Sequence, residues 1–265
     1  MTDSGRGDRP GAAVDAVAAR GYQAGGDDYE RSRPGYPDAA VDLVVQELAL
    51  PRDSRVLELA AGTGKLTRML VRRVAGVIAV EPVPAMRRRL AGAVPSVPVV
   101  AAVAEAIPFA DDSVDGVVVA TAFHWFRGEE AVEEIARVLR PRGGLGLLWN
   151  NPDRSTSWIA DIWSVVDEHR GDTPGNLDQT WRTSFREEGP FQALQQQAFA
   201  HEVEMTPDDV VARVASISFI AALPGAGRAD VLERVRTIIA THPELAGRPS
   251  FPLPYRTSVF WCRRR

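Results

Sequence analysis

Short apolar runs alternate with stretches of helical spacing through the first 150 residues. The runs are typical of strands buried on both faces, and they lie at residues 56–59, 77–80, 97–101, 116–120 and 145–149. Apolar residues three or four positions apart predict helices at residues 41–48, 65–74, 84–91 and 129–139. This alternation predicts an α/β fold, in which helices cover both faces of a largely parallel sheet.

The pattern changes after Asn150. Residues 151–198 hold three tryptophans among Gly, Thr and Asp, and we expect them to form an insertion, or lid, over the carboxyl edge of the sheet. Strand-like runs return at residues 199–205 and 255–261, separated by two predicted helices. The first of these helices begins after Thr206 with a capping-box pattern, and its inward face is predicted to carry Val210, Val211, Val214, Ile217 and Ala221.

Composition limits the domain organisation and the partners. Residues 1–28 are rich in Gly, Asp and Ala, which predicts a flexible tail before a single domain over residues 29–265. The formal charge of −4 argues against nucleic acid or an anionic membrane as a partner. One cysteine and four scattered histidines predict a protein without a metal site. Without a signal peptide or a run near the ~20 apolar residues of a membrane span, we expect a cytoplasmic protein; the sequence leaves its oligomeric state open.

The stretch VLELAAGTGKLTRML, residues 56–70, joins a strand to a helix through a loop of small residues. It lacks the first glycine and the hydroxyl residue of a nucleotide-triphosphate loop, and Thr67 replaces the third glycine of the dinucleotide fingerprint. Glu58 would repel a pyrophosphate, whereas it suits the sulfonium and ammonium groups of S-adenosylmethionine. Glu81 ends the next strand, where a carboxylate accepts hydrogen bonds from the ribose of NAD and S-adenosylmethionine alike.

Four motifs together resemble those of the class I S-adenosylmethionine-dependent methyltransferases: VLELAAGTGKLTRML, VIAVEPVPAM, AEAIPFADDSVDGVVVATAFHWF and RVLRPRGGLGLLWNN. Within that group the chain is similar to the type 11 branch, near the ubiquinone, menaquinone and trans-aconitate methyltransferases. The resemblance implies a Rossmann-like, seven-stranded sheet whose last strand is antiparallel. It also implies transfer of a methyl group from S-adenosylmethionine to a small or medium organic acceptor, with release of S-adenosylhomocysteine.

The resemblance further implies a set of cofactor-binding positions. They are Glu58, Ala60, Gly62 and Gly64 in the loop around methionine and ribose; Glu81 at the ribose; Pro82, Met86, Ala104 and Glu105 around the adenine; Ala120 and Thr121 at the methionine end; and Tyr29 and Arg33 in an N-terminal segment that folds over the cofactor. Because Ala60 replaces the first glycine of the usual loop, we expect its backbone to keep a negative φ.

The candidate general base is His124, which follows the fourth predicted strand at the edge where α/β sheets place ligands. His124, Trp125, Asn150 and Trp158 are candidates for acceptor contact. Packing in a core is the commoner role of an aromatic residue such as Trp125, and satisfying loop backbone is the commoner role of an asparagine in this position. Methyl transfer depends chiefly on alignment, which supplies about 7–11 kcal/mol, whereas a base adds a factor of only about 10² to 10⁴. A base is therefore optional for this chemistry.

Two alternatives stay open from the sequence. The same fold and cofactor can serve cyclisation or a pericyclic step, because a fold does not fix the reaction. The protein can also be a binding protein that keeps the S-adenosylmethionine pocket and has no turnover.

Overall fold

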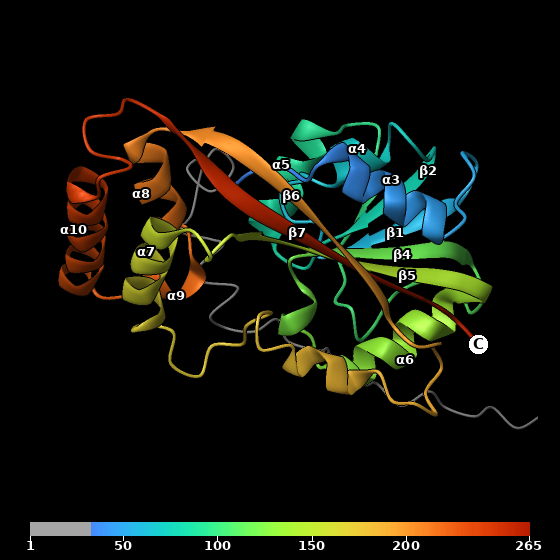
Figure 1. Ribbon diagram of the computed structural model, residues 1–265. Coiled ribbons are helices and arrows are strands. Elements are labelled where there is room, and N and C mark those ends of the chain that lie inside the picture. The colour runs from blue at the N-terminus through green and yellow to red at the C-terminus, as the bar shows by residue number, and fades with distance from the viewer. Residues whose placement is uncertain (1–32) are drawn as a thin grey trace, which may run out of the picture.

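The computed structural model describes residues 33–265, so Tyr29 and the predicted tail lie outside the described part of the chain. A single seven-stranded sheet runs through it, with helices on both faces and a separate group of helices at one end (Figure 1). The strand order is β3-β2-β1-β4-β5-β7-β6. The strands are β1 (Arg55–Leu59), β2 (Gly76–Val80), β3 (Val99–Val100), β4 (Val114–Ala120), β5 (Leu139–Pro152), β6 (Gln195–Met205) and β7 (Phe251–Arg263).

The directions of the strands confirm the predicted fold class. β3, β2, β1, β4 and β5 pair in parallel, whereas β7 pairs antiparallel with β5 on one side and with β6 on the other. β7 is therefore the antiparallel last strand that the resemblance implied. The carboxyl ends of β1, β2, β4 and β5 meet at one edge of the sheet, where ligands of such sheets bind.

Two hydrophobic cores hold helices against the faces of the sheet. One core lies beneath α3 (Asp38–Glu47), α4 (Thr67–Leu70) and α5 (Pro84–Ala93), and the other beneath α6 (Gly128–Val138), which covers the opposite face (Figure 1). Close packing of α3 on β5 explains Gly144, because a Cβ there would lie 2.5 Å from Leu48 Cδ2.

A third core belongs to α7 (Ser157–Asp167), α8 (Pro207–Ala215), α9 (Ser218–Ala221) and α10 (Gly225–Thr241), here called the cap helices. β6 and β7 run from the sheet to this group (Figure 1). Only the first part of the predicted insertion joins it, because Trp181 in the 3₁₀ helix η2 (Thr180–Ser184) packs against Trp149 in the sheet core, with ring centroids 4.5 Å apart. The cap helices therefore come from two segments of the chain, one after β5 and one after β6.

Several element boundaries differ from the prediction. The helix expected to reach Ala221 ends at Ala215, and the chain turns at Ser216, whose Oγ donates to the carbonyl of Arg213, before α9 begins. The helix expected over residues 65–74 is only the short α4, which is flanked by turns. Strand β3 is two residues long, where residues 97–101 were expected. Pro98 offers no N–H, and its carbonyl accepts from Ala79 N.

Candidate cofactor and acceptor site

The small-residue loop leaves the carboxyl end of β1 through three left-handed residues. Ala60 has φ 52°, Gly62 has φ 60° and Gly64 has φ 86°. The amide of Ala61 donates to the carbonyl of Val80 at 3.2 Å, which ties the loop to the end of β2. The prediction that Ala60 keeps a negative φ is therefore wrong, because the tight turn imposes the left-handed conformation in spite of the Cβ.

Glu81 lies at the end of β2, directly beside this loop. Its Oε2 accepts a hydrogen bond from Gly62 N at 2.8 Å, and its Oε1 accepts one from Val83 N at 2.8 Å. Burial raises the pKa of the Glu81 carboxyl, and the hydrogen bonds from the two backbone N–H groups partly offset this rise. Since each carboxylate oxygen has two lone pairs, Glu81 keeps the capacity to accept from ribose hydroxyls.

Glu58 lies deeper than the sequence suggested, with only 1% of its surface exposed. Thr67 at the start of α4 donates its hydroxyl to Glu58 Oε2 at 2.6 Å. Burial raises the pKa of Glu58 to about 8, so the carboxyl is mostly protonated at neutral pH. This corrects the picture of a permanently charged strand end. The sequence did not predict Thr67 as the partner of Glu58. The available signal was that Thr67 occupies the position of the third glycine in the dinucleotide fingerprint.

The residues expected around adenine occupy different environments. Pro82 is partly exposed, whereas Met86 and Ala104 are buried. Glu105 accepts a hydrogen bond from Arg127 N at 2.8 Å, just before α6 begins. A carboxylate near a helix N-terminus is stabilised by the helix dipole, so Glu105 has a structural role independent of any ligand.

An N-terminal segment crosses the carboxyl ends of β4 and β5. Thr121, which follows β4 and Ala120, has φ 53°, and its Oγ1 lies 2.9 Å from the hydroxyl of Tyr36. Asn150 donates from Nδ2 to the carbonyl of Gly35 at 2.8 Å. Arg33 reaches the cap helices and donates to the carbonyl of Ser216 at 3.2 Å. Residues 33–36 therefore connect the sheet edge to the cap helices.

A cavity of about 110 Å³ lies between this sheet edge and the cap helices. Thr121, His124, Trp125 and Asn150 line it from the sheet side. From the other segments it is lined by residues that include Arg33, Arg154, Trp163, Arg170, Arg213 and Phe219. Trp158 is not among them: it is 3% exposed and packs edge-on against Phe251 in the core of the cap helices, so the structure does not place it at this cavity.

His124 lies in the 3₁₀ helix η1 (Phe123–Trp125), just beyond the carboxyl end of β4. The indole Nε1 of Trp149 donates to His124 Nδ1 at 3.2 Å. Burial, followed by the charges of Arg33 and Arg170, lowers the pKa of His124 to about 4, so the ring is neutral at pH 7. Because Nδ1 accepts, the hydrogen bond assigns the proton to Nε2. His124 therefore fits a hydrogen-bond donor better than a general base.

Comparison with known proteins places the chain in a family. A family model described as a methyltransferase domain matches residues 57–147, which span β1 to β5. An uncharacterised methyltransferase of Mycobacterium tuberculosis is 41% identical over 233 residues, covering 86% of this chain and 89% of that protein. The chain belongs to the class I S-adenosylmethionine-dependent methyltransferases.

Two further similarities extend this result. An uncharacterised methyltransferase-like protein of Schizosaccharomyces pombe is 37% identical over 234 residues, covering 88% of this chain and 91% of that protein. A solved structure from Anaeromyxobacter dehalogenans, described provisionally as a type II methyltransferase, matches with a TM-score of 0.65 at 24% identity and covers 88% of this chain and 97% of that one. The latter supports the fold alone. The nearer relationship to the ubiquinone, menaquinone and trans-aconitate methyltransferases stays a prediction.

Asn150 has a structural role in this methyltransferase. In addition to its bond to Gly35, its Oδ1 accepts from the hydroxyl of Thr257 on β7 at 3.0 Å. Both the nitrogen and the oxygen of its side-chain amide therefore bond to other segments of the chain. This favours a role in holding the loop backbone over contact with an acceptor.

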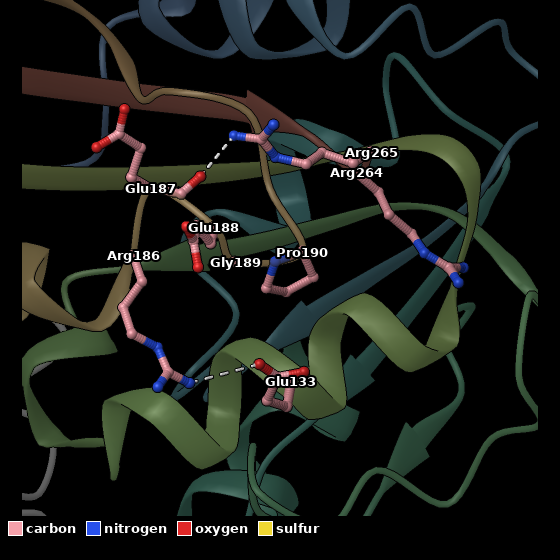
Figure 2. A pocket seen from close by; sticks show the side chains of 8 residues that line it. All are labelled: Glu133, Arg186, Glu187, Glu188, Gly189, Pro190, Arg264 and Arg265. Atoms are coloured by element: carbon pink, nitrogen blue, oxygen red, sulfur yellow. Dashed lines mark hydrogen bonds and ion pairs between the residues drawn. The ribbon is translucent and has the colours of Figure 1, made fainter.

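A second depression lies away from this edge, beside α6 (Figure 2). Arg186 pairs with Glu133 at 3.8 Å, and Arg265 donates to the backbone carbonyl of Glu187 at 2.8 Å (Figure 2). One ion pair joins two of its charged side chains, and it contains none of the predicted site residues. The described part of the chain also holds no group of three potential metal-ligating side chains, and none of its helices is long and apolar enough to cross a membrane.

Proposed function

We propose that this methyltransferase transfers the methyl group of S-adenosylmethionine to a small or medium organic acceptor and releases S-adenosylhomocysteine. The observation that carries the proposal is the carboxylate of Glu81, bonded to Gly62 N in the loop and placed at the same sheet edge as the cavity beside His124. In this proposal the ribose-binding carboxylate at the end of β2 and the acceptor cavity at the ends of β4 and β5 lie on one sheet edge, with β1 between them.

The residues of the loop fit this cofactor. No heavy atom lies within 4 Å of the position that a Cβ of Gly62 would take, so the loop leaves space on that side. Glu81 can accept from the ribose hydroxyls, and Glu58 provides a carboxyl that a nearby positive charge would ionise. When bound, S-adenosylmethionine supplies an electrophilic methyl group on a positively charged sulfur.

The cavity residues supply alignment and exclude water. Trp163 and Phe219 bring apolar surface from the cap helices over the sheet edge, and Arg33 connects the N-terminal segment to them. Fixing the acceptor in this enclosure would reduce the loss of entropy in the reaction, a contribution of about 7–11 kcal/mol to lowering the barrier.

Replacement of Glu81 tests the cofactor site. We expect Glu81→Gln to weaken binding of S-adenosylhomocysteine by about 1.5–3 kcal/mol, because a charged acceptor of the ribose hydroxyls is lost while the side-chain shape is kept. Isothermal titration calorimetry measures this difference. Glu129→Gln on the exposed face of α6 is the matched control and should bind like the unaltered protein.

Two results would contradict the proposal. An unchanged dissociation constant in Glu81→Gln would remove the ribose assignment, and a protein that binds a nicotinamide dinucleotide but not S-adenosylhomocysteine would remove the cofactor. With methyl-labelled S-adenosylmethionine, label in an acceptor supports transfer. Product without label would support a cyclase or another non-methylating enzyme, and binding without any product would support a binding protein.

A further inference from the structure

Four arginines line the cavity at the sheet edge: Arg33, Arg154, Arg170 and Arg213, here called the arginine cluster. They come from four separate places, namely the N-terminal segment, the β5–α7 connection, the residues after α7, and α8. Within the described residues, no aspartate or glutamate lines this cavity. The cavity therefore concentrates positive charge in a protein whose formal net charge is −4.

Arg213 shows that this charge is not a surface feature. It lies on α8 next to the buried Val214, and only 9% of its surface is exposed. Burying a guanidinium carries a desolvation cost. An arginine that served only to keep the helix soluble would lie on the surface and avoid this cost. The charge of Arg213 is therefore directed into the interior of the molecule, toward the cavity that it lines.

Within the described part of the chain, Asp167 lies outside the lining and partly offsets the cluster. Asp167 at the end of α7 accepts from Arg154 Nη1 at 2.5 Å and from Arg170 Nη2 at 3.2 Å. Each guanidinium has five N–H donors. One shared carboxylate therefore orients both arginines and leaves most of their N–H groups able to donate to a ligand. Asp167 thus holds two positive side chains in place at the rim of the cavity.

Among the described lining residues, none is a strong base at neutral pH. His124 is the one described lining residue whose side chain can accept a proton, and its Nδ1 already accepts a hydrogen bond from Trp149. Alcohols and phenols must lose a proton on methylation, and ammonium groups must lose one before it. The arginine cluster would in addition repel a cationic amine.

We propose that the acceptor is a small organic carboxylate, held by the arginine cluster and methylated on a carboxylate oxygen. This inference rests on the proposed methyl transfer. The carboxylate oxygen forms the new O–CH₃ bond while the S–CH₃ bond of S-adenosylmethionine breaks, and the bonding pair passes to sulfur. A methyl ester and neutral S-adenosylhomocysteine result, and no proton moves, so the reaction requires no base. The Nε2–H of His124 is a donor that can orient the acceptor.

Alkali lability of the product tests the bond that is formed. The full-length protein is incubated with ¹⁴C-methyl S-adenosylmethionine and either a deproteinised cell extract or a panel of benzoate, succinate and citrate, with benzamide and phenyl phosphate as matched probes. We expect label that is released as methanol by mild alkali, from carboxylates and not from the amide or the phosphate. Label that resists alkali would overturn the inference while methyl transfer stands, as would an enzyme that binds S-adenosylhomocysteine and labels nothing.

Variants of Arg154 and Arg170, the two arginines that Asp167 holds in place, test the binding of the acceptor carboxylate. Arg170→Gln and Arg154→Gln should each raise KM for the labelled carboxylate about 10- to 100-fold, because a charge-assisted hydrogen bond is lost. The dissociation constant of S-adenosylhomocysteine should stay unchanged, which separates loss of the anion site from misfolding. Arg186→Gln, in the depression of Figure 2, removes the same charge elsewhere and should keep the original KM. Equal KM values in all three variants would contradict the assignment.

Discussion

Two residues with a Cβ adopt left-handed backbone at the candidate site. Ala60 (φ 52°) follows β1, and Thr121 (φ 53°) follows β4. A left-handed conformation costs a residue with a side chain roughly 1–2 kcal/mol, so both positions are held by their surroundings. Hydrogen bonds next to them supply the restraint, from Ala61 N to Val80 O and from Thr121 N to Leu148 O. Backbone strain is thus located where the ligands are expected.

The strain at Ala60 can be tested by relieving it. Ala60→Gly should raise the free energy of unfolding by roughly 1 kcal/mol, because removal of the Cβ clash exceeds the added chain entropy of glycine. Urea unfolding measures the change. Ala61→Gly is the matched control one residue later, where φ is not positive, and should lower the stability. A loss of stability in Ala60→Gly would show that the conformation carries no strain.

Glu58 is expected to make stability depend on pH. Its pKa is about 8 in the folded protein against 4.5 for a free side chain, so the folded state retains a proton between these values that the unfolded state has released. The free energy of unfolding should therefore fall as the pH rises from about 4.5 to 8, by a few kcal/mol. Glu58→Gln keeps the hydrogen bond acceptor for Thr67 and should flatten this dependence.

Unfolding midpoints in urea at pH 5 and pH 8 provide the comparison between the unaltered protein and Glu58→Gln. Glu129→Gln serves as the control, since this exposed side chain on α6 should leave the slope as it is. If the slope is the same in Glu58→Gln, then Glu58 is ionised in the folded protein and the burial argument fails.

At the scale of single elements, the start of α8 has a complete capping box. Asp209 N donates to Thr206 Oγ1 at 3.2 Å, and Thr206 N donates to Asp209 Oδ2 at 2.9 Å. Two of the N–H groups that a helix leaves unsatisfied at its start are paired in this way. The box fixes where α8 begins after β6, and hence where Arg213 lies relative to the cavity.

Removal of this cap should destabilise the protein by about 1 kcal/mol. The variant is Thr206→Ala, and the loss is that of one N-cap side chain. Thr156→Ala at the N-cap of α7 is the control, because Thr156 forms no side-chain cap hydrogen bond there and its loss should cost less. Thermal or urea unfolding of the two variants gives the comparison. Equal losses would indicate that the box contributes nothing beyond the β-region backbone of the N-cap.

At the scale of the whole molecule, Asn150 joins three parts of the chain. Its amide connects the segment at Gly35, its own strand β5, and Thr257 on β7. Thr257 is fully buried, and its hydroxyl otherwise lies 3.5 Å from His201 Nδ1. The N-terminal segment that crosses the site is therefore anchored to the sheet by Asn150 in addition to the contact between Tyr36 and Thr121.

Asn150→Ala should lower the free energy of unfolding by about 1–3 kcal/mol, because the carbonyl of Gly35 loses its donor and the buried hydroxyl of Thr257 keeps only the longer contact to His201. It should also speed amide hydrogen exchange over residues 33–37, which the bond to Gly35 restrains. Asn151→Ala is the neighbouring control, since Asn151 makes neither bond. Exchange that is equally fast in both variants would show that other contacts hold the segment.

The sequence by itself determined the order of the main strands and helices, the glycine loop and Glu81 at the end of β2, whereas the antiparallel last strand was implied by the family resemblance. These features depend on local apolar periodicity or on short motifs, which are written in consecutive residues. His124 and Trp125 lie at the sheet edge where the sequence located them, and their roles stay predictions. The sequence misplaced Trp158, because an apolar helix face looks the same whether it faces a cavity or a core.

Only the tertiary structure brought together Arg33, Arg154, Arg170 and Arg213, which are separated by up to 180 positions in the chain. It also decided the left-handed turn at Ala60, the protonation of Glu58 and the bond from Trp149 that fixes the tautomer of His124. Charge, burial and tautomer depend on neighbours that arrive from distant segments. No local pattern of residues encodes such neighbours, so the chemistry of this cavity is a property of the folded chain.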